Sequence, residues 1–551
     1  MPVRFFTRFH QMDLLFASIE RKIRPAPATP LRAGISAALL LGLASTAEPT
    51  AGQLADLVTA PERTGWMETT RYDEAVAFLE TVADASPLAH LTRMGYSTEG
   101  RAIPLLVVGR VDDPSPEAVL ASGLLRVYLQ GDIHGGEVPG KEALLMLVRD
   151  LLSEDEPRWL DELVLLVTPI YNVDGNERVI LSNRPRQNGP FGGMGQRPNA
   201  QGLDLNRDHM KLDAPEARSL AAMLTAYDPE VGVDLHTTNG TRHAYHLTYS
   251  PPLHPGTSVA IDRLLRDEAL PRITERIRER DGWHVYYYGN ARRTPEGEMG
   301  WYTFDHRPRF NNNYLGLRNR VAILSEAYAY ATYEDRVRVT RRFVEEILDW
   351  AAESGDRIRA VVAEADTPVA GETLPVRATF QGSPELVDIL MGEVETLRHP
   401  FTGAPILNRL DVVEPVPMRE FGTFRATDSE VVPTRYLIPP DVDVALDRLG
   451  AHGVRTTTAE SPLNVQGEVF RIDSASVAER EFQGHRERTV FGTWEVRDVT
   501  LPAGTRIVET AQPLGRLAFY LLEPRSDDGL TSWGLLDEHL EDGVYPIVRV
   551  R

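Results

Sequence analysis

Short apolar runs alternate with segments of helical spacing through the first 350 residues. Uninterrupted apolar runs favour buried strands, whereas apolar residues recurring every three or four positions favour helices. The runs lie at 103–108, 124–129, 163–167, 231–235 and 321–324, and the helix-like segments at 72–85, from 141 onwards, 215–227, 261–280 and 337–352. This alternation predicts an α/β fold, with a mixed, mostly parallel central sheet flanked by helices.

The pattern changes after residue 355. Asp366-Thr-Pro and Gly371 are typical of a linker. Short strand-like runs broken by proline and glycine follow at 376–380, 431–438, 468–472, 488–494 and 517–522, with one expected helix at 443–449. We therefore predict a first domain at 60–355 and a β-rich second domain at 366–551, whose role the sequence does not indicate.

The first 52 residues resemble a leader. Four basic residues between 21 and 32 precede the apolar stretch 33–44, and small residues follow at 45–47 and 51–52. This order is typical of a secretory signal, and the apolar stretch is short for a bilayer span. An uncleaved anchor or a disordered leader is the alternative. The pattern predicts a periplasmic or secreted protein that is not stably inserted in a membrane once the signal is removed.

Composition narrows the possible chemistry. The 551 residues include 59 basic and 80 acidic side chains, a formal net charge of −21, and no cysteine. Because an acidic surface repels phosphate backbones, nucleic acid is not expected as a partner. The lack of cysteine excludes disulfides, thiolate metal ligands and a thiol nucleophile. Any zinc site must therefore use histidine and carboxylate ligands.

Four residues supply such groups close to predicted strands. His134, with Glu137 three positions later, follows the run 124–129, His236 follows 231–235, and Glu326 follows 321–324. In a sheet of this kind, functional groups gather at the carboxyl ends of the strands. Two histidines and a carboxylate can hold zinc with one position open to water, and a second carboxylate can accept that water's proton. Taken singly, His236 could equally be a hydrogen-bonded core histidine, and a His-x-x-Glu spacing often arises by chance.

Gly202-Leu-Asp-Leu-Asn-Arg207 offers different chemistry. Arg207 can pair in bidentate fashion with a carboxylate, and Asn206 adds an amide donor. A surface salt bridge is the alternative for Arg207. The phrase 168–175, which contains Asn-Val-Asp-Gly, is interpreted as a structural turn.

These phrases, in this order, resemble the zinc carboxypeptidase family of metallopeptidases over roughly residues 65–350. The resemblance implies one zinc ion bound by His134, Glu137 and His236, with Glu326 as general base. It also implies a peptide substrate whose free C-terminal carboxylate is bound by Asn206 and Arg207. The family's oxyanion arginine is expected among residues 184, 186 and 197, with Arg186 favoured by spacing. Its mobile tyrosine is expected at Tyr302, with Tyr314 as the rival.

The function predicted is therefore a secreted or periplasmic zinc metallocarboxypeptidase that hydrolyses the C-terminal peptide bond of peptides. One alternative is an N-acyl-amino-acid deacylase resembling the succinylglutamate desuccinylase and aspartoacylase group, which shares the first histidine phrase. A cell-wall peptide amidase and a non-catalytic binding protein with the same fold are further alternatives. Retention of all four metal-site residues speaks against the last of these.

Overall fold

The computed structural model describes residues 54–551 except 155–156, 239 and 541. The predicted leader at 1–52 lies outside these residues. Within the described part of the chain, no helix is both long and apolar enough to cross a membrane.

An eight-stranded mixed sheet forms the centre of the first part of the chain. Its strand order is β1-β2-β4-β3-β5-β10-β6-β7. The bounds are β1 Ala89–Tyr96, β2 Ala102–Val108, β3 Leu125–Gly131, β4 Leu163–Thr168, β5 Val231–Thr238, β6 Leu247–Ser250, β7 Val285–Tyr287 and β10 Val321–Tyr328. The four central strands β4, β3, β5 and β10 run parallel, whereas β1–β2, β2–β4 and β10–β6 are antiparallel. The predicted mixed, mostly parallel sheet is confirmed.

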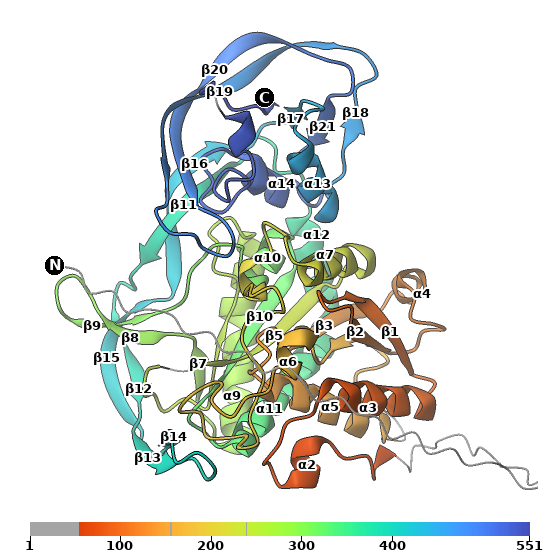
Figure 1. Cartoon of the computed structure of the whole chain (residues 1–551), viewed down its shortest axis with the longest axis vertical. Coiled ribbons are helices and arrows are strands. Elements are labelled where there is room, and N and C mark those ends of the chain that lie inside the picture. Colours follow the sequence, from red (N-terminus) through yellow and green to blue (C-terminus); the bar gives the residue numbers. More distant parts are fainter. Residues whose placement is uncertain (1–53, 155–156, 239, 541) are drawn as a thin grey trace, which may run out of the picture. The chain divides into compact units, whose positions relative to one another are not determined.

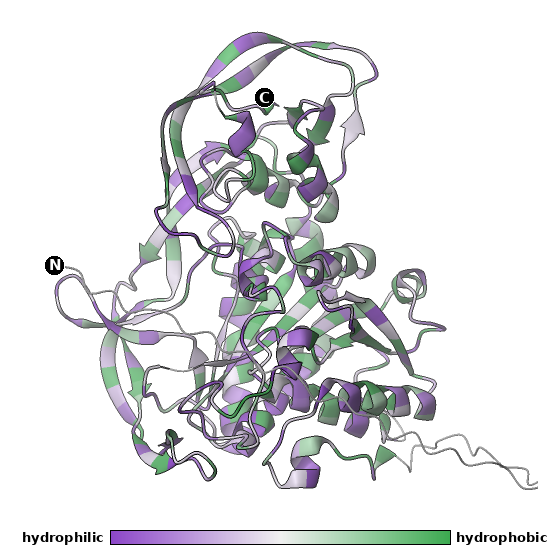
Figure 2. Ribbon diagram, in the orientation of Figure 1, coloured by the Kyte–Doolittle hydropathy of each residue, from purple (hydrophilic) through white to green (hydrophobic). Residues whose placement is uncertain are grey.

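Helices cover both faces of this sheet. On one face lie α3 (Tyr72–Ala85), α5 (Pro139–Leu152), α9 (Leu270–Asp281) and α11 (Tyr333–Glu353), and on the other lie α7 (Pro215–Tyr227) and α10 (Asn311–Leu317) (Figure 1). All residues of β4 and β5 are buried, and the hydrophobic colouring of Figure 2 follows these central strands. Two covered faces explain why the strands appear in the sequence as continuous apolar runs.

The C-terminal part is rich in β-strands, as predicted. Strands β11 (Thr373–Gln381) and β16 (Thr423–Val431) pair with each other, as do β13 (Val394–Arg398) and β14 (Pro405–Arg409). A six-stranded sheet follows, with the order β18 (Thr457–Thr458), β21 (Arg506–Glu509), β17 (Arg435–Ile438), β22 (Val548–Val550), β19 (Leu463–Val477) and β20 (Arg488–Leu501). The expected helix at 443–449 is α13 (Asp443–Ala451).

Two expected strands differ from the structure. The run 517–522 belongs to helix α14 (Gly515–Leu522), whose last six residues are all buried. A short apolar run that is buried on all sides has no periodicity, so it does not distinguish a helix from a strand. The run 431–438 is interrupted, because β16 ends at Val431 and β17 begins at Arg435.

The two predicted domains share a sheet. Strand β15 (Glu414–Phe421) pairs with β12 (Leu386–Met391) on one side and with β9 (Met299–Tyr302) on the other, and β9 pairs with β8 (Asn290–Arg293). The described residues from 54 onwards belong to one compact unit. The segment 366–551 therefore completes a sheet that the segment 60–355 begins. The division into two domains at these bounds stays a proposal.

Candidate active site

The predicted metal-site residues meet at the carboxyl ends of three neighbouring strands. His134 follows β3, His236 lies in β5, and Glu326 lies in β10. In the parallel pairing of β10 with β5, Glu326 is directly opposite His236. Sheet register thus brings together residues that are 90 positions or more apart in the sequence.

His134, Glu137 and His236 direct three ligand atoms towards one point. The Nδ1 atom of His134 lies 3.0 Å from Glu137 Oε1, and Nδ1 of His236 lies 2.9 Å from Glu137 Oε2. One ligand atom from each residue lies within 4.8 Å of the others, and all three side chains are buried. Two imidazole nitrogens and a carboxylate oxygen are a donor set that suits zinc.

Two further carboxylates contact the imidazole nitrogens that do not face Glu137. His134 Nε2 lies 3.0 Å from Asp204 Oδ1, and His236 Nε2 lies 2.9 Å from Asp234 Oδ2. When each Nε2 carries the proton, each Nδ1 presents its lone pair towards Glu137 and a bound ion. Burial alone would raise the pKa of Asp234, but His236 and the Gln130 amide hold that pKa below its usual value.

Glu326 is a buried carboxylate beside this group. Its Oε2 has no hydrogen-bond partner among the described residues. Burial raises the pKa of Glu326 to about 8 against the opposing charges of His236 and Arg197, while Glu137 adds to the rise. Desolvation and neighbouring charges of this kind are characteristic of groups that exchange protons.

A cavity of about 230 Å³ connects the metal-site residues with Asn206 and Arg207. Its lining is His134, Glu137, Arg184, Arg197, Asn206, Arg207, His236, Thr237, Thr238, Tyr288, Phe304, Phe310, Leu324 and Glu326. Asn206 and Arg207 lie in a 3-10 turn (Leu205–Arg207), in which the Asp204 carboxylate accepts a hydrogen bond from the Asn206 amide. The Arg207 guanidinium stacks on the Phe310 ring at 3.9 Å.

The expectation for the oxyanion arginine needs correction. Arg186 does not line this cavity, whereas Arg184 and Arg197 do. Arg184 Nη2 lies 2.7 Å from Glu137 Oε1, and Arg197 Nη1 lies 3.7 Å from the same oxygen. Arg197 also pairs with Asp204 at 2.7 Å. Sequence spacing could not rank the three because their segment is an irregular loop, in which alternation of side-chain direction is lost.

The expectation for the tyrosine also needs correction. Tyr302 stacks on Phe421 of the C-terminal part at a centroid distance of 4.1 Å and does not line the cavity. Tyr314 is buried, with its hydroxyl 2.8 Å from His452 Nδ1. The tyrosine that lines the cavity is Tyr288. The one feature of the sequence that could have indicated Tyr288 as a site residue is its position directly after strand β7.

Burial and the nearby Glu326 charge raise the pKa of Tyr288 to about 12, so its hydroxyl keeps its proton at neutral pH. The Asn290 amide donates a hydrogen bond to this hydroxyl at 3.1 Å. Phe304 and Phe310, which line the same cavity, were also missed, because aromatic residues in loops are indistinguishable from packing residues in a single sequence.

Comparisons with known proteins agree with this geometry. Residues 75–239 match the zinc carboxypeptidase family model. The chain is 25% identical over 514 residues to "Carboxypeptidase 2" of Trichophyton rubrum, covering 88% of this chain and 87% of that protein. It is 35% identical over 147 residues to "Carboxypeptidase D" of Rattus norvegicus, covering 23% of this chain and 11% of that protein.

A solved structure, a putative carboxypeptidase A from Shewanella denitrificans OS-217, overlaps 52% of this chain and 69% of its own, with 17% identity and a TM-score of 0.39. Because this TM-score is low, the comparison adds nothing to the description of the fold that the strand order provides. The family match and the similarity along most of the chain confirm the resemblance, and the His-Glu-His group could hold the metal ion. The chain resembles the zinc carboxypeptidase family and is a zinc-dependent metallocarboxypeptidase.

Proposed function

We propose that this enzyme acts outside the cytoplasm and releases the C-terminal residue of peptides, with Glu326 as general base. The observation that carries the proposal is the register of β10 against β5. It sets a buried carboxylate with an unpartnered oxygen opposite His236, within one cavity that also contains Asn206 and Arg207. The extracytoplasmic location rests on the signal-like pattern at 1–52 alone.

His134, Glu137 and His236 are the proposed ligands of one zinc ion. When bound, zinc supplies a Lewis acid that lowers the pKa of water and polarises the scissile carbonyl. Glu326 takes a proton from the attacking water and delivers it to the leaving amine. Asp204 and Asp234 keep the two imidazole rings oriented during these transfers.

Asn206 and Arg207 are the proposed binders of the substrate's terminal carboxylate. The Arg207 guanidinium is restrained by the Phe310 ring, so its planar fork is held in place before substrate arrives. Asn206 Oδ1 accepts a hydrogen bond from the Asn311 amide at 2.8 Å, which leaves the Asn206 side-chain NH₂ for a ligand.

Oxyanion stabilisation is proposed for Arg184 or Arg197. Both lie within 4 Å of Glu137 and line the cavity, so either places a positive charge beside the developing negative charge. Replacing each in turn by methionine should separate them. Loss of the arginine that stabilises the oxyanion should lower kcat by about 10²-fold or more. Loss of the other arginine should chiefly raise KM.

An acyl-amino-acid deacylase and a cell-wall peptide amidase are the alternatives. Similarity along most of the chain to a protein named as a carboxypeptidase supports the peptidase. Peptides with free C-termini, acyl-amino acids and muropeptides should be assayed side by side. Cleavage of acyl-amino acids alone would contradict the peptide substrate proposed.

The decisive variant is Glu326→Gln, which keeps the size of the side chain and removes its basicity. We expect release of C-terminal residues to stop while zinc content, measured by mass spectrometry, stays at the wild-type level. Glu334→Gln, in the first turn of α11 and outside the cavity, is the control and should retain activity. Unchanged turnover in Glu326→Gln would remove Glu326 from the proposed role.

A further inference from the structure

A second cavity, of about 240 Å³, lies beside the metal-site cavity. One wall is the loop 181–194 of the α/β part, and the other is the turn and strand 399–406 of the C-terminal part. Its lining is Leu181, Ser182, Asn183, Arg184, Pro185, Arg186, Gln187, Pro190, Met194, His399, Thr402, Ala404, Pro405 and Ile406. Leucine, isoleucine, methionine, alanine and three prolines make this lining largely apolar. The C-terminal part thus supplies part of a cavity next to the active site.

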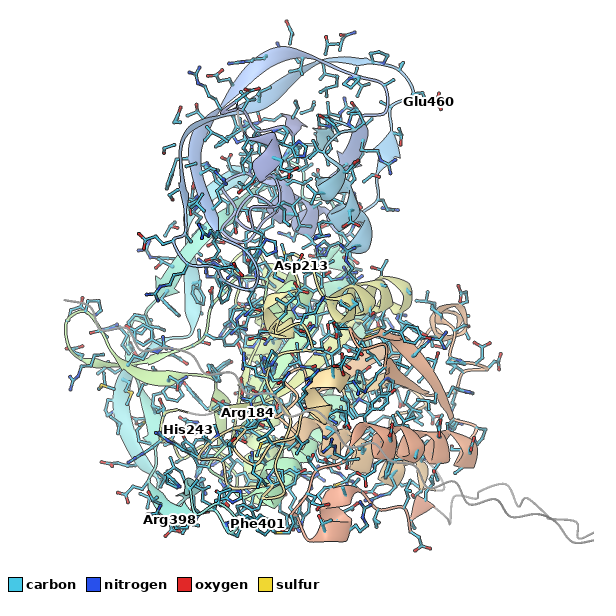
Figure 3. All side chains as sticks on the ribbon, in the orientation of Figure 1. Arg184, Asp213, His243, Arg398, Phe401 and Glu460 are labelled. Atoms are coloured by element: carbon cyan, nitrogen blue, oxygen red, sulfur yellow. The ribbon has the colours of Figure 1, made fainter. Side chains whose placement is uncertain are left out.

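Arg184 is common to the linings of both cavities. Its guanidinium lies 2.7 Å from Glu137, one of the proposed zinc ligands. Figure 3 labels Arg184 in the α/β part of the molecule. The second cavity therefore begins at a residue that already contacts the metal site, and a peptide extending from that site can reach it.

Gln187 gives this apolar cavity a polar group. The side chain is only 3% exposed. Its Oε1 accepts a hydrogen bond from Arg336 at 2.8 Å, whereas its Nε2 has no partner among the described residues. A buried donor without a partner costs free energy unless a ligand satisfies it. A peptide carbonyl is an acceptor of suitable chemistry.

The two walls are joined by hydrogen bonds. The Leu407 amide donates to the Arg186 carbonyl at 2.9 Å, and the Asn188 side chain donates to Asn408 Oδ1 at 2.7 Å. The β13–β14 hairpin is thereby attached to the loop that carries Arg184. A cavity with largely apolar walls, a buried donor without a partner among the described residues and fixed sides has the properties of a ligand subsite.

We propose that this cavity is a substrate subsite for an apolar side chain upstream of the scissile bond. The substrate's terminal carboxylate lies at Asn206 and Arg207, its scissile bond at the metal site, and its upstream residues pass Arg184. One upstream side chain enters the second cavity, and the adjacent backbone carbonyl accepts a hydrogen bond from Gln187 Nε2. This inference rests on the peptidase activity proposed above.

The test uses the full-length enzyme and peptides of two kinds. Short N-acyl dipeptides react at the metal site but lack upstream residues. Longer peptides carry a single leucine, moved one position at a time through an otherwise glycine–serine upstream segment. At one position, leucine should raise kcat/KM about tenfold or more over glycine, because its side chain becomes buried.

Two variants should remove this preference. Ala404→Arg places a long charged side chain in the cavity from an exposed position of the hairpin turn. Gln187→Glu keeps the acceptor for Arg336 but replaces the donor that the peptide carbonyl needs. We expect the leucine preference to disappear in the first and to fall several-fold in the second, with short dipeptides cleaved at the wild-type rate. Phe401→Arg is the matched control, since Phe401 is in the same turn, 62% exposed and absent from the lining.

Three outcomes would contradict the subsite. The first is an equal kcat/KM for leucine and glycine at every upstream position in the wild type. The second is a leucine preference that persists in Ala404→Arg. The third is an equal loss of the leucine preference in Ala404→Arg and Phe401→Arg, because the preference would then not depend on the residues that line the cavity. Failure to release any residue from short dipeptides and longer peptides alike would instead contradict the proposed peptidase activity.

Discussion

The central sheet and the C-terminal strands are buried to very different extents. Every residue of β4 and β5 is buried, whereas β16 and β20 have buried residues at only one and two positions. The central sheet is therefore stabilised chiefly by apolar burial. The C-terminal strands rely more on strand pairing and on polar contacts with the α/β part.

Charged pairs join the two parts. Arg309 of the α/β part lies 2.7 Å from Asp528 and 2.6 Å from Glu487. His485 lies 2.7 Å from Asp213, which Figure 3 shows at the junction of the two parts. Junction contacts of this kind should respond to pH and to loss of single charges more strongly than the apolar core. Four experiments test that contrast.

Removal of residues 366–551 should have the largest effect. It deletes β15, the partner of β9, and removes Asp528 and Glu487 from Arg309 and Asp527 from His306. We expect the fragment 1–365 to be insoluble or unfolded by circular dichroism and to have no peptidase activity. A soluble, active fragment would show that the α/β part folds independently and that the two predicted domains are separable.

Replacement of Asp528, the buried partner of Arg309, should have the second-largest effect. Asp528→Ala leaves the Arg309 guanidinium buried, with Glu487 as its remaining partner, and should lower the free energy of unfolding by about 3–5 kcal/mol. Arg63→Ala breaks the exposed Arg63–Glu74 pair and should cost less than about 1 kcal/mol. Urea unfolding of both variants measures the difference. Equal losses in the free energy of unfolding would mean that the junction is no more sensitive to the loss of one charge than the surface is.

The His306–Asp527 contact should make the junction pH-dependent. Burial alone would lower the pKa of His306, but hydrogen bonds to Asp305 and Asp527 raise it to about 9. The groups around His306 are Asp305, Asp527, Arg307, His254, Phe424 and Tyr520, and the pKa of His254 is lowered to about 3 by burial.

His306 is charged in both folded and unfolded chains below pH 6.5, so its stabilising contribution is complete there. It is lost as pH rises from about 6.5 through about 9, and this raised pKa corresponds to about 3 kcal/mol of stability. His306→Asn should flatten this part of the stability–pH profile, measured by thermal unfolding. A wild-type profile that does not fall between these values would contradict the assignment.

The smallest effect concerns the hairpin tip between β19 and β20. There the Gln483 side-chain oxygen accepts a hydrogen bond from the Asp204 amide at 2.7 Å. Asp204 precedes Asn206 and Arg207, so Gln483→Ala should loosen the turn that binds the terminal carboxylate. We expect KM to rise about fivefold with little change in kcat, since one hydrogen bond contributes about 1 kcal/mol. Gln483→Glu keeps an acceptor oxygen and should restore KM. A loss confined to kcat would contradict this role.

The sequence predicted β2, β3, β4, β5 and β10 because both faces of the sheet are covered there, which makes each of these strands a continuous apolar run. It did not predict β1, β6 and β7. It also predicted where His134, His236 and Glu326 would meet, since residues after parallel strands share one edge of a sheet. The same reasoning failed at 517–522, where a fully buried run is helical, and at Arg186 and Tyr302. Those two residues belong to segments whose side-chain direction depends on what packs against them.

By itself, the sequence determined the α/β class, the candidate metal-ligand set and the reaction type, because these depend on local apolar patterns and on residue types that few other chemistries require. Only the tertiary structure decided that Arg184, Arg197 and Tyr288 line the cavity and that the C-terminal part borders the active site. These features depend on contacts between loops that are distant in the chain. Contacts of that kind are set by packing and register across the whole fold, and leave no periodic trace in the sequence.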